Sequence, residues 1–191
     1  MVFFLHRPLV AQMVEQLPFK EMVAGSIPAE RTMKKAYNTI LILPDIRSTY
    51  NVGAIFRTAD ACGVNKIYLT GYTPCPLDRF GRVRSDIAKA SLGAEISMPW
   101  EYKKTLIPLI KKLKKDGYEV VGLEQDKRAI DYKKFKQNKN LALILGNEVS
   151  GLSTSILNLC DLIIEIPMKG EKESLNVSVA SGIALFRILN V

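Results

Sequence analysis

Short apolar runs alternate with helical patterns along the chain from residue 39 onward. Such runs are typical of buried strands, and we expect six, at residues 39–44, 66–71, 95–99, 118–124, 141–146 and 162–167. Apolar residues at helical spacing predict helices at 51–62, 85–91, 105–117 and 175–189. The alternation predicts an α/β fold: a mainly parallel six-stranded sheet with helices on both faces. Such sheets bind ligands beyond the carboxyl ends of their strands, so polar residues there are candidate site residues.

The first 32 residues lack this periodicity. They resemble a conceptual translation of a transfer RNA gene, because VAQMVEQ back-translates to a D-arm-like string and GSIP to the conserved T-arm. We therefore expect residues 1–32 to be a leader from a misassigned start, disordered and without function. Met33 would then be the initiator and 33–191 the functional domain. The alternative is an ordinary N-terminal arm.

Composition narrows the class of protein. The chain has 191 residues, 48% hydrophobic and 24% charged, as in a globular domain rather than a disordered tail or a disulfide scaffold. No apolar run approaches the ~20 residues of a membrane-spanning helix, so we expect no membrane association. The three cysteines, Cys62, Cys75 and Cys160, lack a CxxC motif and predict reduced thiols in a cytoplasmic protein.

Two counts bear on the chemistry. A net charge of +8 favours a polyanionic partner. The single histidine, His6, lies near the N-terminus and argues against histidine metal ligation or histidine general-base catalysis. We expect no metal.

Polar residues follow the first predicted strand. Asn51 stands where a helix begins, and Gly53 and Arg57 share one helix face at i, i+4. The glycine would leave a gap in front of the guanidinium that suits a planar or phosphate-bearing ligand. The alternative is a helix N-cap and an ordinary surface arginine.

Two later strand ends also carry polar residues. After residues 141–146, Gly146 would allow a ligand close to the backbone and Glu148 places a carboxylate there. A strand-to-helix turn capped by Ser150 or Ser153 is the alternative. After residues 162–167, a loop leads to Ser174 and Asn176 and to a helix rich in small residues, which predicts close packing; Ser174 as a helix cap is the alternative.

The three segments together resemble the SpoU family of RNA ribose 2′-O-methyltransferases, in the SPOUT superfamily. The family's Asn-x-Gly-x-x-x-Arg motif stands here as Asn51, Gly53 and Arg57. Its Gly-x-Glu motif, followed by a glycine, stands as Gly146, Glu148 and Gly151. Its third motif stands as Ile-Pro-Met at 166–168 and Ser-Leu-Asn-Val-Ser at 174–178. Order and spacing agree over residues 39–190; Val149 departs from the glycine of many members.

The resemblance implies a C-terminal trefoil knot, a homodimer whose interface includes the small-residue helix, and S-adenosylmethionine bound in the knot. Carried over, the cofactor-binding residues are Leu123, Gly146, Ile166, Ser174 and Leu175. The catalytic residues are Asn51, Arg57, Glu148 and Asn176. The family's arginine is often assigned as general base, but a guanidinium with a pKa above about 12 is a poor proton acceptor.

The resemblance therefore implies that the protein promotes the reaction mainly by aligning the ribose with the cofactor. We expect Arg57 to fix the ribose and a phosphate and to stabilise the forming alkoxide, while water or phosphate takes the proton. Glu148 and Asn176 would orient Arg57, and Asn51 would position the sugar.

A basic stretch after the second strand is the candidate RNA surface: Arg79, Arg82, Arg84 and Lys89, with Phe80 available to stack on a base. For the lysines between residues 103 and 115, a solvated helix face is at least as good an explanation. We expect structured RNA as substrate, with tRNA slightly favoured over rRNA. The alternatives are a catalytically idle RNA-binding module of the same fold and a base methylase of the same superfamily.

Overall fold

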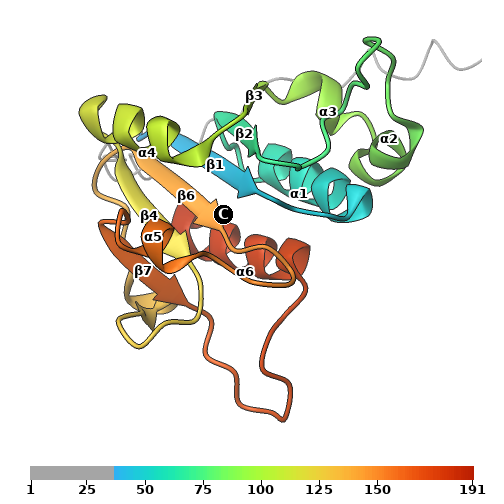
Figure 1. The fold of residues 1–191 in the computed structure, drawn as a ribbon. Helices are drawn as coiled ribbons and strands as arrows, with labels where there is room; N and C mark the ends of the chain where they lie inside the picture. The colour runs from blue at the N-terminus through green and yellow to red at the C-terminus, as the bar shows by residue number, and fades with distance from the viewer. Residues whose placement is uncertain (1–36) are drawn as a thin grey trace, which may run out of the picture. The chain divides into compact units, whose positions relative to one another are not determined.

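The structure is a computed structural model that describes residues 37–191, so the predicted leader at 1–32 lies outside the described part. Its sheet contains seven strands in the order β3-β2-β1-β6-β4-β7-β5, and every pairing between them is parallel (Figure 1). The strands are β1 (Thr39–Pro44), β2 (Lys66–Thr70), β3 (Trp100–Lys103), β4 (Glu119–Leu123), β5 (Ile130–Asp131), β6 (Leu141–Leu145) and β7 (Leu162–Glu165).

Helices cover both faces of this sheet, as expected. They are α1 (Thr49–Ala61), α2 (Ser85–Ser91), α3 (Ala94–Ser97), α4 (Leu106–Lys115), α5 (Thr154–Leu157) and α6 (Val177–Leu189), with a 3₁₀ turn at Tyr132–Lys134. One apolar core joins the sheet to α1 and α6, and a second joins its other face to α4 and α5. The central strands β1 and β6 are buried along their whole length, which explains their unbroken apolar sequences.

The prediction of six strands is wrong at two positions in the chain. Residues 95–99 do not form a strand: most of them lie in the short helix α3, and β3 begins only at Trp100. The buried Glu95 side chain accepts hydrogen bonds from the Ser91 hydroxyl and, at 3.0 Å, from the Gly93 N–H, which fixes this helical turn. The other error is β5, whose two residues are too few to give a periodic pattern.

Two helix starts also differ from expectation. The N-cap of α1 is Ser48, whose hydroxyl accepts a hydrogen bond from the Asn51 N–H, so Asn51 lies inside the first turn. The N-cap of α6 is Asn176, whose carbonyl oxygen accepts from the Ser178 N–H, so Ser174 is not the helix cap. The first cap thereby fixes the backbone of Asn51, and the second fixes the side chain of Asn176.

Within residues 37–191, no helix has the length and apolar character required to cross a membrane. The same residues contain no group of three or more His, Cys, Asp or Glu side chains that could hold a metal ion. The three cysteines are free thiols. The predicted trefoil knot stays a prediction.

Candidate active site

A pocket opens at the carboxyl ends of the neighbouring strands β4, β6 and β7, closed on one side by the loop that leads to α6. The five residues predicted to bind a cofactor line it together: Leu123, Gly146, Ile166, Ser174 and Leu175. Its wall also contains residues that were not predicted to bind the cofactor: Glu124, Gln125, Leu145, Asn147, Glu148, Glu165, Met168, Val177 and Ala180. The walls are therefore largely apolar, with polar groups at the strand ends.

Glu124 is the most consequential residue that the sequence analysis missed. Its Oε2 accepts a hydrogen bond from the Leu152 N–H at 2.8 Å, which ties the end of β4 to the loop after β6. A Cβ at Gly146 would lie 2.2 Å from this oxygen, and one at Gly151 only 2.3 Å from it. The close approach that we predicted at Gly146 is thus made by the Glu124 carboxylate, so this glycine is required by the protein's own packing.

The three predicted motifs meet in one hydrogen-bonded network. Asn51 Nδ2 donates to Glu148 Oε1 at 2.7 Å, and Asn176 Nδ2 donates to Asn51 Oδ1 at 3.1 Å. The Arg47 N–H donates to Glu148 Oε2 at 3.3 Å. The loops after β1, β6 and β7, far apart in sequence, are therefore joined at the pocket rim through these side chains.

Glu148 is held as a carboxylate by its neighbours. Burial alone would raise its pKa, but hydrogen bonds from the Asn51 side chain and from the backbone N–H groups of Glu148, Arg47 and Ser48 lower the pKa below its ordinary value. Glu148 therefore accepts hydrogen bonds near neutral pH and does not store a proton.

Arg57 does not join this network. Its side chain is exposed and makes no hydrogen bond or ion pair with any residue between 37 and 191. It lies six positions after Asn51, which places it about 9 Å along α1 and roughly 120° around the helix axis. The structure therefore gives no contact through which Glu148 or Asn176 would orient Arg57.

Gly53 was expected to leave a gap beside Arg57, and that expectation is wrong. A Cβ at this buried position would lie 2.6 Å from the Ile87 carbonyl oxygen and 2.7 Å from the Ala90 Cβ. The space is filled by α2, so Gly53 allows α1 and α2 to pack closely rather than admitting a ligand.

The predicted RNA-binding arginines lie on a hairpin closed by an antiparallel bridge between Leu77 and Val83. The guanidinium carbons of Arg79 and Arg82 lie 4.7 and 5.0 Å from the centre of the Phe80 ring, whose residue is 65% exposed. Arg82 forms an ion pair with Asp78, and Arg84 forms one with Asp86. Within the described residues, the side chains of Arg79 and Lys89 form no ion pair.

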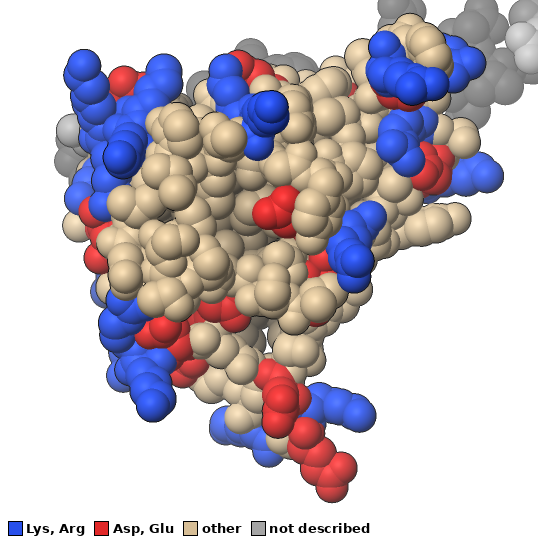
Figure 2. All heavy atoms as spheres, in the orientation of Figure 1, with Lys and Arg blue, Asp and Glu red and all other residues tan. Residues whose placement is uncertain are grey.

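Basic side chains are spread over several parts of the face drawn in Figure 2, among them the region of α4 and the region of α2 with the hairpin before it. On α4, Lys112 forms an ion pair with Asp116 and Lys114 forms one with Asp161, so part of that charge is locally neutralised.

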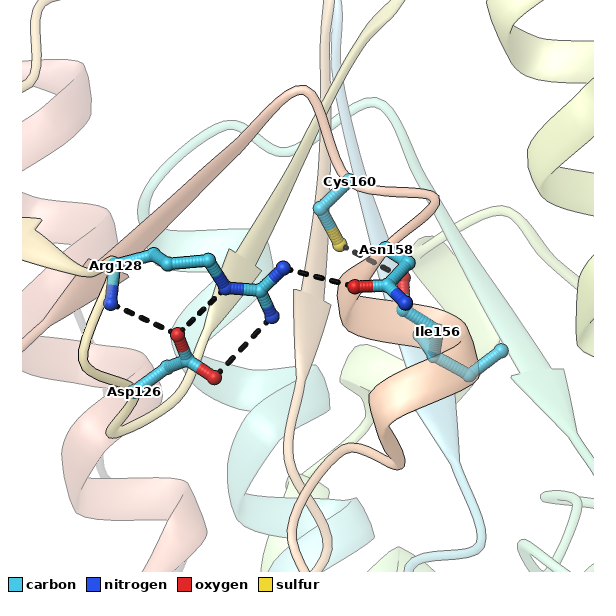
Figure 3. Close-up of polar contacts among 5 residues, drawn as sticks. All are labelled: Asp126, Arg128, Ile156, Asn158 and Cys160. Atoms are coloured by element: carbon cyan, nitrogen blue, oxygen red, sulfur yellow. Dashed lines mark hydrogen bonds and ion pairs between the residues drawn. The ribbon is translucent and has the colours of Figure 1, made fainter.

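A further set of contacts fixes the loop after β4, next to the pocket (Figure 3). The Arg128 side chain donates to Asp126 Oδ1 at 2.8 Å and to Asn158 Oδ1 at 2.8 Å, linking this loop to the end of α5. Close by, Cys160 Sγ donates to the Ile156 carbonyl oxygen at 3.4 Å. Burial raises the pKa of the Cys160 thiol to about 11, so the thiol stays protonated and unreactive.

Comparisons with known proteins identify the family of this chain and its fold. Residues 38–186 match the model of the SpoU rRNA Methylase family. A Staphylococcus haemolyticus relative, which its name places in the TrmH family of tRNA/rRNA methyltransferases, is 36% identical over 155 residues, covering 81% of this chain and 59% of the relative. The chain thus spans about 60% of the length of the curated relatives that it matches.

Two solved structures share the fold. An AdoMet-bound rRNA methyltransferase from Sinorhizobium meliloti matches with a TM-score of 0.71 at 30% identity, over 78% of this chain and 55% of that one. The A. aeolicus TrmH/SpoU tRNA modifying enzyme matches with a TM-score of 0.71 at 26% identity, over 81% of this chain and 75% of that one.

Proposed function

The chain belongs to the SpoU rRNA methylase family, and we propose that it transfers the methyl group of S-adenosylmethionine to a ribose 2′-hydroxyl of structured RNA. The main support for this proposal is that the three motifs, far apart in sequence, lie together at one pocket. The five predicted cofactor residues line one pocket, and Asn51, Glu148 and Asn176 are hydrogen-bonded to one another at its rim. An idle RNA-binding module would need neither feature.

The pocket residues fit S-adenosylmethionine. Apolar side chains from β4 and from the loop before α6 offer surfaces for an adenine ring: Leu123, Ile166 and Leu175. Glu124, Glu148 and Glu165 also line the pocket, and their carboxylates suit a ligand with a positively charged sulfonium. When bound, this cofactor supplies a methyl group that a nucleophile can displace. The S. meliloti structure contains AdoMet, which supports the same ligand here.

The protein's part in this reaction is alignment. The Asn51 amide is fixed at both ends, by Glu148 and by Asn176, so it holds one orientation at the pocket rim, where it can position a ribose. Orientation of this kind contributes roughly 7–11 kcal/mol in favourable intramolecular cases. Arg57, free of ion pairs within the described residues, contacts a phosphate and stabilises the forming alkoxide. The proton passes to water or to the phosphate, because a guanidinium cannot accept it.

The protein acts as a homodimer. On α6, Val179, Ile183 and Phe186 form an exposed apolar stripe, being 50%, 37% and 47% exposed. Their spacing of i, i+4 and i+7 places them on one helix face. Because α6 packs against α1, with Gly182 next to Thr58, a second copy seated on this stripe would lie beside Arg57. Arg57 then completes the pocket of the partner, which accounts for its distance from the pocket of its own chain.

The names of the relatives mention both tRNA and rRNA, and of these two substrates we favour tRNA slightly for this protein. The hairpin that carries Arg79, Phe80 and Arg82, with Lys89 on α2, provides a basic surface for either. Mapping 2′-O-methyl positions in total RNA from cells with and without the gene identifies the target. Loss of a tRNA mark supports our preference, loss of an rRNA mark reverses it, and loss of a base methylation alone contradicts ribose methylation.

The catalytic assignment is tested with Arg57→Ala. We expect methyl transfer to fall at least about 10²-fold, because a group that stabilises developing charge is removed. Binding of S-adenosylmethionine, measured by calorimetry, should be unchanged, since Arg57 does not line the pocket of its own chain. Near wild-type transfer by the purified variant would show that the assignment is wrong. Lys111→Ala, on the exposed side of α4, is the matched control.

A further inference from the structure

A second part of the sheet's carboxyl edge carries exposed side chains that the proposed reaction does not use. Tyr72 follows β2 and is 59% exposed, and Tyr102 lies in β3 and is 44% exposed. Arg47, in the loop after β1, is exposed, and its guanidinium makes no hydrogen bond or ion pair within residues 37–191. We name these three residues the tyrosine edge.

Hydrogen bonds and short backbone segments connect this edge to the catalytic network. The Tyr102 hydroxyl donates to the Gly71 carbonyl oxygen at 2.8 Å. The Tyr72 N–H donates to Asp45 Oδ1 at 3.1 Å. Two residues after Asp45, the Arg47 N–H donates to Glu148. The tyrosine edge therefore extends the pocket rim along the ends of β1, β2 and β3.

The backbone under Tyr72 is held in one conformation. Asp45 has a φ of 55° and Gly71 a φ of 63°, and a Cβ at Gly71 would lie 1.9 Å from Asp45 Oδ1. On the other side of Tyr72, the Thr73 hydroxyl is buried, donates to the Leu43 carbonyl oxygen and accepts from the Ile46 N–H. A left-handed non-glycine residue such as Asp45 is unfavourable and is often found at functional sites. The aromatic ring is thus presented to solvent from a rigid base.

We propose that the tyrosine edge binds unpaired nucleotides of the RNA next to the methylated ribose, with a base stacked on Tyr72 and a phosphate contacted by Arg47; the inference rests on the proposed function. An exposed aromatic ring suits the flat face of a base, and a guanidinium free of ion pairs within residues 37–191 suits its phosphate; both side chains follow strand ends at the same edge of the sheet. In a duplex both faces of each base are covered by neighbours, so stacking requires an unpaired strand. The substrate class is therefore RNA whose target nucleotide lies in a loop or at an end.

A second copy of the chain is a poorer occupant for this surface. The exposed stripe on α6 is purely apolar, whereas the tyrosine edge combines aromatic rings with a cation. The excess of 27 basic over 19 acidic residues in the chain complements RNA phosphates.

Binding of RNA to the full chain tests this inference directly. The probes are a short single-stranded RNA of mixed sequence and the duplex that it forms with its complement, measured by fluorescence anisotropy at one fixed salt concentration. For Tyr72→Ala and Tyr72→Leu we expect about tenfold or greater loss of affinity for the single strand, because a stacking partner is removed. Tyr72→Phe, which keeps the ring, should bind within about twofold of wild type. Duplex affinity should change little in all three variants.

Ile96→Ala provides the control, because Ile96 is 79% exposed on α3, which precedes β3 and so lies away from the carboxyl edge. The affinity of each variant for S-adenosylmethionine should be unchanged, and this measurement verifies that the variant is folded. Wild-type affinity of Tyr72→Ala for the single strand, or an equal loss of duplex affinity, would overturn the inference. Methyl transfer to RNA is measured separately. If the wild-type protein binds single strands through Tyr72 but methylates no RNA, the proposed function is contradicted, whereas RNA binding by the tyrosine edge is still supported.

Discussion

At the scale of single residues, the pocket wall depends on one carboxylate and two glycines. Glu124 lies between Gly146 and Gly151 and accepts the Leu152 N–H, so it joins the end of β4 to the loop that carries Glu148. A side chain at either glycine would displace this carboxylate. Gly151 has in addition a φ of 61°, a conformation that favours glycine.

We therefore expect Gly151→Ala to destabilise the protein by about 1–3 kcal/mol, through left-handed backbone strain and displacement of Glu124. The same change should weaken binding of S-adenosylmethionine, because the loop forms one wall of the pocket. Urea unfolding and calorimetric titration measure the two effects. The matched control is Gly170→Ala, where an added Cβ meets no atom within 4 Å and φ is not positive. Equal stability of the two variants would contradict the role given to Glu124.

At the scale of elements, the ion pairs of β3 show how an edge strand without an apolar run is held in place. Glu101 on β3 contacts Lys66 on β2 at 2.8 Å and also pairs with Lys103. Hydrogen bonds from Lys103 and Lys66 lower the pKa of Glu101 to about 2. β3 is half-exposed, so these polar contacts and its parallel pairing to β2 replace the apolar burial of β1 and β6.

The lowered pKa of Glu101 predicts a pH-dependent contribution to stability. A carboxyl group whose folded pKa lies below its unfolded value stabilises the protein above the unfolded value, near 4.5, and loses that contribution as the pH falls toward 2. Glu101→Gln should therefore reduce the free energy of unfolding near neutral pH, by at most about 1 kcal/mol for a pair this exposed. The difference should shrink as the pH falls to about 3.

Urea unfolding across this pH range measures the difference. Glu171→Gln, which removes an exposed carboxylate without an ion pair in the described residues, should leave stability unchanged. A Glu101→Gln effect that is the same at all pH values would show that the ion pairs do not stabilise β3.

At the scale of the whole molecule, the position of Arg57 on α1 predicts how two copies cooperate. The pocket and the Asn51–Glu148–Asn176 network belong to one chain, whereas Arg57 neither lines that pocket nor joins that network, and the next residue, Thr58, lies against Gly182 of α6. In the proposed dimer, each active site combines the pocket of one protomer with Arg57 of the other.

Co-expression of two inactive variants, Arg57→Ala and Glu148→Gln, tests this arrangement. Random pairing makes half of the dimers mixed, and each mixed dimer contains one intact site, so about one quarter of the wild-type methyl transfer should return. No return of activity in mixed dimers, verified by differential tagging, would place Arg57 in the pocket of its own chain. The Arg57→Ala variant co-expressed with itself serves as the inactive control.

Elements with a local apolar pattern and motifs with fixed spacing could be predicted from the order of the amino acids alone. The buried runs of β1, β4, β6 and β7 and the stripe of α4 predicted their positions, and Asn51, Glu148 and Asn176 were identified before their contacts were known. The elements can be predicted because buried positions on a strand or a helix recur along the sequence with a regular period.

The contacts between segments distant in sequence depend on how the chain is packed in three dimensions. Four such features leave no periodic pattern in the sequence. They are the packing of Gly53 against α2, the hydrogen bond of Glu124 to a residue 28 positions away, the placement of β3 and the separation of Arg57 from the network. Side chains from different elements compete for the same space, and which of them fills it depends on how the sheet order brings strand ends together. The motifs in the sequence therefore predicted part of the pocket lining and the Asn51–Glu148–Asn176 network, whereas the role of Glu124 and the packing around Gly53 and Gly146 depend on the tertiary structure.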